Sequence, residues 1–125
     1  MKKRDLEFLK SHDLSRMATV SAEGRPHVVP VVYAIDGPDV IVAVDYGTKK
    51  LKNLRENNHV ALVVDDYDPN HAVMIEGDCE ILERGREYRR LLQVLYDRFE
   101  FYRNNPWNEG ESPILKIHPT KIVGW

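Results

Sequence analysis

The sequence predicts a mostly β fold with inserted helices, and three observations lead to this fold class. Roughly six or seven short apolar segments are bounded by turn residues, as in antiparallel sheets. One helical pattern follows the third of these segments, and a longer helical pattern precedes the last pair. Because helices do not alternate with the strands, we expect an antiparallel barrel and not a parallel βα sheet.

The first half of the predicted barrel is a meander of three strands behind a short helix. Two leucines among charged residues predict an amphipathic helix over residues 3–12. Glu23 and Gly24 give a turn signal between the first two strands, and Gly37 and Pro38 give another before the third. The three strands are expected at Leu14–Ala22, Pro26–Ile35 and Val40–Asp45.

A helix and two further strands are expected in the middle of the chain. The helix is predicted over Thr48–Asn57, with Leu51 and Leu54 facing inward, and the apolar run Val60–Asp65 follows it as a strand. Residues 72–82 alternate between apolar and acidic side chains, which predicts a strand with one buried and one solvated face.

The last part of the chain predicts the longest helix and two closing strands. The helix is expected over Arg84–Arg103, because apolar residues recur there at helical spacing. Pro119 separates the two predicted strands, Pro113–His118 and Lys121–Trp125. Since no linker or internal repeat occurs, we expect residues 1–125 to form a single domain.

Composition excludes several classes of function. The 18 basic and 20 acidic residues are mixed along the chain and leave a net charge of −2, so neither a nucleic acid nor a membrane surface is an expected partner. The N-terminus has no sustained apolar run, which argues against a signal peptide or a spanning helix. The one cysteine, Cys79, excludes an intramolecular disulfide and fits a reducing compartment. We therefore expect a cytoplasmic protein.

The familiar catalytic motifs are missing. The chain has no nucleophile elbow, Walker loop, dinucleotide-binding glycine motif or zinc-protease motif. The five histidines lack ligand spacing, so we expect no metal site. Cys79 falls on the apolar face of its predicted strand, where a small buried hydrophobe is the expected role. No catalytic residue is predicted, which leaves a cofactor site as the expected source of chemistry.

The start of the helix at Thr48–Asn57 has an unusual charge pattern. The N-terminus of a helix carries partial positive charge, so lysines are disfavoured in its first turn. Thr48 is a good N-cap, yet Lys49 and Lys50 follow it. An anion such as a phosphate would resolve the conflict, because free N–H groups, a hydroxyl and two ammonium groups would converge on it. The alternative is that both lysines point into water, and spacing alone leaves the two open.

The order of several short motifs gives the chain a family resemblance over roughly Leu14 to Leu82. The motifs are Ala18–Val20, Gly24–Pro26, Val28–Val31, Thr48–Lys50, Asn53–Leu54 and Val60–Val64. Together they resemble the pyridoxamine 5′-phosphate oxidase-like, FMN-binding split-barrel superfamily. The resemblance implies an antiparallel split β-barrel and a homodimer that holds flavin in a groove between its two chains.

The resemblance also implies residues for the flavin site. The flavin phosphate would be held by Thr48, Lys49 and Lys50, of which Lys50 occupies the lysine of the family's Ser/Thr-x-Lys pattern. The strands beside the isoalloxazine ring would contribute Val29, Pro30, Val31, Ala43 and Val44.

Other residues have two open interpretations each. Arg16 is either a second anion contact or a surface arginine at the start of a strand. Trp125 and Trp107 could each cover the flavin, because a planar apolar ring stacks well on another, and the alternative for Trp125 is that it closes the barrel. Tyr33 and Tyr46 are equally undecided.

Two departures from the vitamin B6 oxidases bear on the substrate. Those enzymes carry Arg-x-Val-Leu-Leu-Lys on the second strand, where this chain has Val29–Ala34 and neither cation. Their Arg-Leu-x-Pro signature is replaced by Lys116–Pro119. The leading hypothesis is therefore an FMN-binding, flavin-dependent oxidoreductase for a different small substrate. The alternatives are a deazaflavin-dependent reductase, for whose oligoglutamate tail extra lysines would be favourable, and a non-catalytic flavin-binding or flavin-storage protein.

Overall fold

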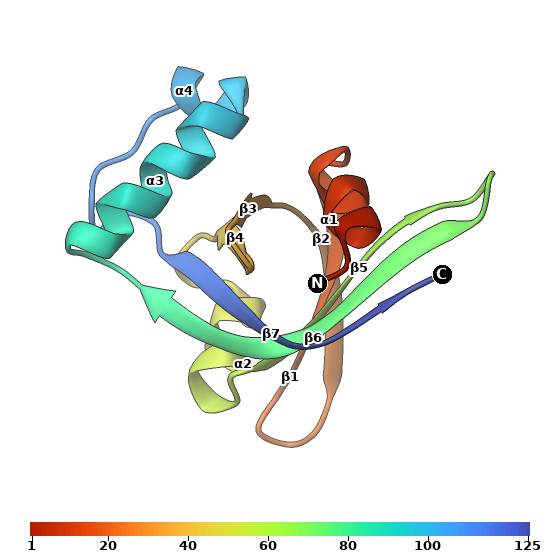
Figure 1. The fold of residues 1–125 in the computed structure, drawn as a ribbon. Coiled ribbons are helices and arrows are strands. Elements are labelled where there is room, and N and C mark those ends of the chain that lie inside the picture. The colour runs from red at the N-terminus through yellow and green to blue at the C-terminus, as the bar shows by residue number, and fades with distance from the viewer.

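The computed structural model describes residues 1–125 as one seven-stranded antiparallel sheet that curls into an open barrel (Figure 1). The strands are β1 (Leu14–Val20), β2 (Pro26–Val32), β3 (Ala34–Asp36), β4 (Asp39–Ala43), β5 (His59–Asp66), β6 (His71–Leu82) and β7 (Ile114–Gly124). The helices are α1 (Lys3–Lys10), α2 (Lys49–Glu56), α3 (Arg86–Arg98) and α4 (Glu100–Asn104). The predicted fold class is confirmed.

The barrel is split between two strands that are neighbours in the chain. The strand order is β2-β1-β5-β6-β7-β4-β3, so β2 and β3 lie at opposite edges of the sheet. The prediction of one strand over Pro26–Ile35 was wrong, because the chain leaves the sheet at Tyr33. The backbone N–H of Tyr33 donates to the Asp13 carbonyl at 3.1 Å, and its buried hydroxyl donates to the Leu9 carbonyl at 2.5 Å. These bonds tie the split to α1 and give Tyr33 a structural role.

The two predicted closing strands are one strand, β7, that continues through Pro119. The register between β6 and β7 shifts at Glu76 and Gly77, and Pro119 pairs with Gly77 at this β-bulge. A bulge leaves one residue outside the ladder, so a proline is tolerated there. A Cβ atom on Gly77 would lie 2.5 Å from the His118 carbonyl oxygen, which explains the glycine.

The predicted long helix is interrupted at Phe99, whose backbone is extended with φ −121° and ψ 113°. The chain turns there, and the short helix α4 begins at Glu100. In Figure 1 α3 and α4 stand outside the barrel, on the side of β3 and β4. Tyr88, Leu91 and Leu95 of α3 are buried there, as the helical spacing predicted, in a small core separate from the barrel interior.

The barrel interior is the main core, and its members come from every strand except β3 as well as from α1 and α2. Cys79 lies in this core, as predicted, and burial raises the pKa of its thiol to about 12. The apolar face predicted for residues 72–82 also packs inward, with Val73, Ile75 and Gly77 buried. None of the helices has the length and apolar character required to span a bilayer.

Candidate functional site

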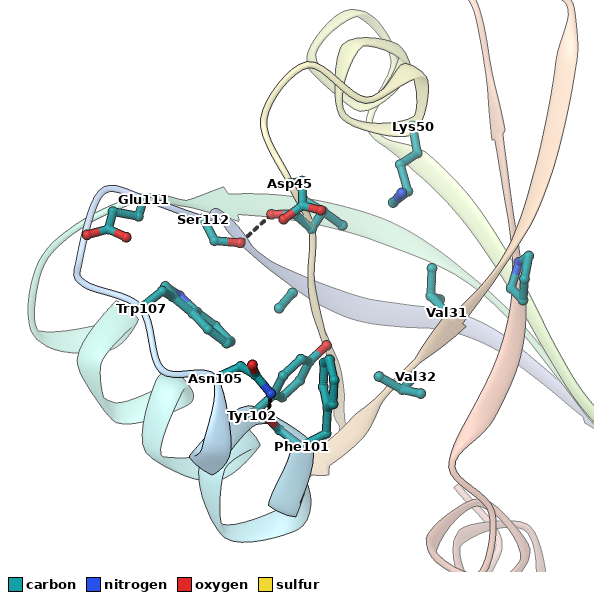
Figure 2. A pocket seen from close by; sticks show the side chains of 13 residues that line it. Val31, Val32, Asp45, Lys50, Phe101, Tyr102, Asn105, Trp107, Glu111 and Ser112 are labelled. Carbon is teal, nitrogen blue, oxygen red and sulfur yellow. Dashed lines mark hydrogen bonds between the residues drawn. The ribbon is translucent and has the colours of Figure 1, made fainter.

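A pocket of about 550 Å³ opens where the barrel edge, α2 and the α4 region meet (Figure 2). Its volume lies within the range usual for small-molecule and cofactor sites, roughly 300–1,000 Å³. Its wall is formed by the end of β2, the end of β4, Lys50 of α2, and the segment from Phe101 to Ser112. The segment that precedes the last strand thus completes a pocket that begins on the barrel.

The barrel side of the pocket is apolar and held by main-chain hydrogen bonds. Val31 and Val32 of β2 line it on one side, and Ala43 and Val44 line it at the end of β4. The backbone N–H of Val44 donates to the Pro113 carbonyl at 3.0 Å, and the buried Ser112 hydroxyl donates to the Val44 carbonyl at 2.6 Å. Both polar backbone groups of Val44 are therefore satisfied, which keeps this side rigid.

Lys50 is the only basic residue that lines the pocket. Its half-buried side chain points from the first turn of α2 into the cavity, and its ammonium group makes no ion pair or protein hydrogen bond (Figure 2). The helix begins after Thr48, but the Thr48 hydroxyl makes no capping bond to a helix N–H and donates to the Asp45 carbonyl at 2.9 Å. The first turn of α2 thus presents a free cation and unbonded backbone N–H groups.

Aromatic side chains form the opposite wall. Phe101 and Tyr102 project from α4, and Trp107 stands beside them from the following loop (Figure 2). The rings of Tyr102 and Trp107 meet edge to face, with centroids 5.1 Å apart and an interplanar angle of 87°. The same geometry joins Tyr102 to Phe99 at 5.5 Å and 80°. Edge-to-face pairs are a favourable aromatic arrangement, so these rings support one another.

Trp107 is fixed by three hydrogen bonds. Its indole Nε1–H donates to the Tyr88 hydroxyl at 2.8 Å, and that hydroxyl donates to the Ser112 carbonyl at 2.5 Å. Its backbone N–H donates to the Tyr96 hydroxyl at 3.1 Å, and its carbonyl accepts from the same hydroxyl at 3.2 Å. Because Tyr88 is fully buried, the indole ring is anchored to the core under α3.

Two acidic residues border the pocket, and the carboxylate of one of them, Glu111, is directed outward (Figure 2). Asp45 and Glu111 line it, and neither side chain forms an ion pair or a hydrogen bond. The Tyr102 hydroxyl points into the cavity as well and has no partner (Figure 2). Burial, together with the negative charge of Asp45, raises the pKa of Tyr102. Tyr102 therefore stays protonated at neutral pH and is available as a hydrogen-bond donor.

The structure brings together half of the residues predicted for the site and leaves the others elsewhere. The predicted residues that line the pocket are Lys50, Pro30, Val31, Ala43 and Val44. Val29 is partly buried and packs against the barrel core. Thr48 and Lys49 line a separate hollow of about 490 Å³ on α2, together with Lys52 and Arg55.

The remaining predicted residues lie outside the pocket. Arg16 pairs with Asp65 on the exposed side of the sheet, at 3.0 Å. Trp125 is 54% exposed, and its backbone pairs with Ala72. Of the two tryptophans considered, Trp107 is therefore the one in the pocket wall. The Tyr46 hydroxyl donates to Glu83 at 2.7 Å, away from the pocket.

Sequence reasoning missed much of the aromatic and acidic wall. The helical spacing places Tyr102 in a continuous amphipathic helix, and no motif marks Phe101 or Glu111 as a site residue. The available signal was the density of aromatic residues between Phe99 and Trp107 in a segment that also contains Asn-Asn-Pro. Such a segment is too rich in large apolar rings for an ordinary solvated loop.

Comparison with known proteins relates the whole chain to one family. The family model described as pyridoxamine 5′-phosphate oxidase matches residues 1–125. A relative from Streptomyces rimosus subsp. rimosus, 5a,11a-dehydrotetracycline/5a,11a-dehydrooxytetracycline reductase, is 34% identical over 131 aligned positions. The alignment covers 98% of this chain and 80% of the relative.

Solved structures share the fold. A conserved hypothetical protein from Mycobacterium tuberculosis superposes with a TM-score of 0.82 at 21% identity, over 100% of this chain and 84% of that protein. HutZ, the heme storage protein from Vibrio cholerae, superposes with a TM-score of 0.84 at 16% identity, over 98% and 92% of the two chains. At these identities the likeness shows the architecture alone, whatever each protein binds.

Proposed function

Because the chain belongs to the pyridoxamine 5′-phosphate oxidase family, we propose that it is a flavin-dependent oxidoreductase that binds FMN in the pocket beside Lys50. The observation that carries this proposal is the free ammonium group of Lys50, which points into a cavity with no other basic residue. An unpaired cation in a partly apolar pocket favours an anionic ligand. A phosphate group on a planar cofactor meets that requirement.

The residues around Lys50 suit a phosphate. The helix Lys49–Glu56 has no acidic residue in its first turn, so the partial positive charge of its N-terminus is not neutralised. Its first N–H groups have no capping side chain, and they are available to phosphate oxygens. Lys49 flanks this end of the helix and adds a second ammonium group outside the pocket, whereas the Thr48 hydroxyl is occupied by its bond to the Asp45 carbonyl. Lys50 would hold the phosphate and the helix end would orient it.

The apolar side of the pocket suits the ring system. Val31, Ala43 and Val44 would exclude water from one side of an isoalloxazine ring, and Pro30 would border its edge. The bound flavin would supply the exchange of electrons with the substrate. Arg16, which pairs with Asp65, and Trp125, which is 54% exposed, lie outside the pocket, so the interpretation of each as a flavin contact has no part in this proposal.

A second copy of the chain would complete the site. The outer side of β2 exposes apolar residues that no element of this chain covers, with Val28 65% exposed. Pro30 lies on this outer side and also lines the pocket, and its register partner on β1 is Arg16. Monomeric proteins rarely leave a contiguous apolar surface uncovered. A homodimer formed through this face, with flavin at its border, is therefore part of the proposal. A cytoplasmic location is a separate part of it.

The substrate is a small molecule other than a vitamin B6 phosphate. The second strand lacks both cations of the vitamin B6 oxidases, and the pocket offers Lys50 as its only cation, so a phosphorylated substrate would have no charge left to bind once FMN is present. The Streptomyces relative is a reductase of a dehydrotetracycline, which supports a reductive reaction on an organic ring compound.

A deazaflavin is the second candidate cofactor, and one observation favours it. Lys49 and Lys52 lie in the separate hollow on α2, where they would attract an oligoglutamate tail that leaves the pocket, while Arg55 of the same hollow is already paired with Glu83 at 3.0 Å. A flavin-binding or flavin-storage protein without catalysis uses the same pocket and differs only in the absence of a substrate.

Titration of cofactor-stripped protein tests these proposals. FMN, riboflavin and a deazaflavin are titrated into the wild type, Lys50→Ala and the control Lys49→Ala, with flavin fluorescence as the readout. We expect FMN to bind more tightly than riboflavin, and Lys50→Ala to weaken FMN at least tenfold while riboflavin is unchanged. Equal losses for both ligands would overturn the phosphate assignment. Preference for the deazaflavin would select the second cofactor. In a separate assay, reoxidation of the reduced, flavin-loaded protein by added acceptors no faster than that of free flavin would indicate a storage protein.

A further inference from the structure

We propose that the aromatic wall of the pocket, formed by Phe101, Tyr102 and Trp107, is the substrate site, and that it takes a planar conjugated ring with a hydrogen-bond acceptor on its edge. The hydroxyl of Tyr102 binds that acceptor and makes Tyr102 a specificity-determining residue. This inference rests on the proposed function, because it assigns Lys50 and the barrel side of the pocket to the flavin and leaves the aromatic wall for a second molecule.

The rings of the wall are in place before a ligand binds. Trp107 is anchored at its indole nitrogen and at both backbone groups. Tyr102 packs edge to face against Trp107 and against Phe99, with centroids 5.1 Å and 5.5 Å apart. A side chain that is already fixed loses little conformational freedom when a ligand lies against it. The wall is therefore preorganised for an aromatic contact.

Phe101 is the uncovered ring of the wall. Its side chain is 70% exposed on α4, and its ring centroid lies 6.0 Å from that of Tyr102. A single exposed phenylalanine needs no explanation, but several large rings that line one cavity are typical of a ligand-binding groove. A flat conjugated ligand would cover Phe101 and gain the favourable contacts of one aromatic ring with another. A ligand of similar size that is not flat gains less.

The Tyr102 hydroxyl is the one side-chain donor of this wall that has no partner. The Asn105 amide donates to the Phe101 carbonyl at 2.9 Å, and the Trp107 indole and the Ser112 hydroxyl are occupied by the bonds described above. The Tyr102 hydroxyl points into the cavity (Figure 2). A carbonyl or a ring nitrogen accepts such a bond. A ligand without an acceptor would cover the hydroxyl and leave it unpaired, which is unfavourable.

The wall recognises its ligand without charge. Its side chains are neutral, Asp45 lies on the side of Lys50, and the Glu111 carboxylate is directed outward (Figure 2). Contact between rings and one hydrogen bond are therefore the interactions that the wall offers. The expected substrate is distinguished by its flat shape and by the position of its acceptor atom.

The test measures the binding of three uncharged probes of similar size to the FMN-loaded protein by calorimetry. Coumarin is planar and carries a carbonyl, 2-adamantanone carries a carbonyl but is not planar, and naphthalene is planar but has no acceptor. We expect coumarin to bind more tightly than 2-adamantanone by about fivefold or more, because its rings contact the wall. Binding of 2-adamantanone as tight as that of coumarin would overturn the inference.

Tyr102→Phe tests the hydrogen bond. This variant keeps the ring that packs against Trp107 and removes a hydroxyl that has no bond within the protein, so it should fold normally. It should weaken coumarin by about fivefold, the usual value of one neutral hydrogen bond, and should not weaken naphthalene. The control is Tyr67→Phe, whose side chain is 95% exposed on a distant turn, and it should change neither. An unchanged affinity for coumarin in Tyr102→Phe, or equal losses for both probes, would overturn the role of Tyr102.

Two further measurements place the probes on the wall. Phe101→Leu retains an apolar side chain but removes the flat ring, so it should weaken coumarin and naphthalene by about threefold and leave 2-adamantanone unchanged. In ¹⁵N-labelled protein, coumarin should shift the indole N–H signal of Trp107 and leave that of Trp125, which lies outside the pocket, in place. Trp125→Phe assigns the two signals. A shift of the Trp125 signal alone would put the binding site elsewhere and contradict the proposal.

The flavin titration and this test can fail separately. If FMN binds with the expected dependence on Lys50 but coumarin binds no more tightly than 2-adamantanone, the substrate assignment fails while the flavin proposal stands. If FMN does not bind but stripped protein binds coumarin with the expected dependence on Tyr102, the flavin proposal fails and the aromatic site stands.

Discussion

The side-chain amide of Asn53 donates a hydrogen bond of 3.0 Å to the hydroxyl of Thr19, and both residues are buried. Asn53 belongs to α2 and Thr19 to β1, so this bond fixes the helix on the barrel wall. The helix also buries Leu51 and Leu54 in the barrel core. Lys50 precedes Asn53 by less than one turn, and its position in the pocket therefore depends on the same attachment.

Replacing Asn53 with Ala should lower the free energy of unfolding by about 1–3 kcal/mol, because the variant removes a hydrogen bond and leaves the buried Thr19 hydroxyl without its donor. Chemical denaturation of Asn53→Ala, Thr19→Val and the double variant forms a complete cycle. The double variant should be more stable than the sum of the single losses predicts. Strict additivity would show that the two groups do not interact.

Tyr88 should be essential for the position of Trp107. Tyr88→Phe removes the acceptor of the indole N–H and the donor to the Ser112 carbonyl, while the buried ring remains. We expect a loss of about 1–3 kcal/mol in stability, together with a change in Trp107 fluorescence and weaker binding of planar ligands. The comparison is Tyr67→Phe, whose side chain is 95% exposed. An unchanged tryptophan signal in Tyr88→Phe would contradict the anchoring role.

The sequence predicts the barrel side of the pocket better than its outer wall, and the reason is physical. β2, β4 and α2 are defined by local patterns of apolar residues and turns, so Val31, Val44 and Lys50 fall where those patterns place them. The outer wall depends on the break at Phe99, where neither glycine nor proline interrupts the helical spacing. Tyr102 therefore has the spacing of a core residue, although α4 turns it toward the cavity.

Prediction at the strand ends fails for a related reason. Tyr33 has the β propensity to continue β2, but its hydroxyl and backbone bonds to residues near α1 draw the chain away from the sheet. Pro119 has the opposite effect, since a proline predicts an end to the strand while the bulge opposite Gly77 allows β7 to continue. In both cases contacts between segments distant in the sequence decide the outcome, and a local pattern does not contain them.

His118 should make stability depend on pH. Its ring nitrogens lie 3.3 Å from Glu80 and 3.0 Å from Asp39, and these hydrogen bonds raise its pKa above 6.5 against the opposing effects of partial burial and Lys116. A raised folded-state pKa means that the stabilisation is complete below the unfolded value of 6.5 and is lost as pH rises through the folded value.

The free energy of unfolding of the wild type should thus fall between pH 6 and pH 9 relative to that of His118→Gln. Because His118 is half exposed, the difference should stay below about 1 kcal/mol. Denaturation curves of the two proteins across this range provide the measurement, and Glu80→Gln should reduce the difference. A gap that widens with increasing pH would have the wrong sign for this assignment.

Replacing Val28 with Glu should separate the proposed dimer. Val28 lies near the middle of the exposed apolar side of β2, opposite Ala18 of β1, and a carboxylate there would have to be buried without a partner when two copies associate. We expect association to weaken by at least tenfold, or about 1.4 kcal/mol, while the monomer keeps its fold because the position faces solvent. Sedimentation velocity over a range of concentrations gives the association constant, and circular dichroism checks the fold. Tyr67→Glu, at the tip of the β5–β6 hairpin, is the control and should leave association unchanged.

If FMN lies at the border of this interface, Val28→Glu should also weaken the binding of FMN, although it leaves Lys50 intact. A monomeric wild type, or a Val28→Glu dimer as stable as the wild type, would place the interface on another surface.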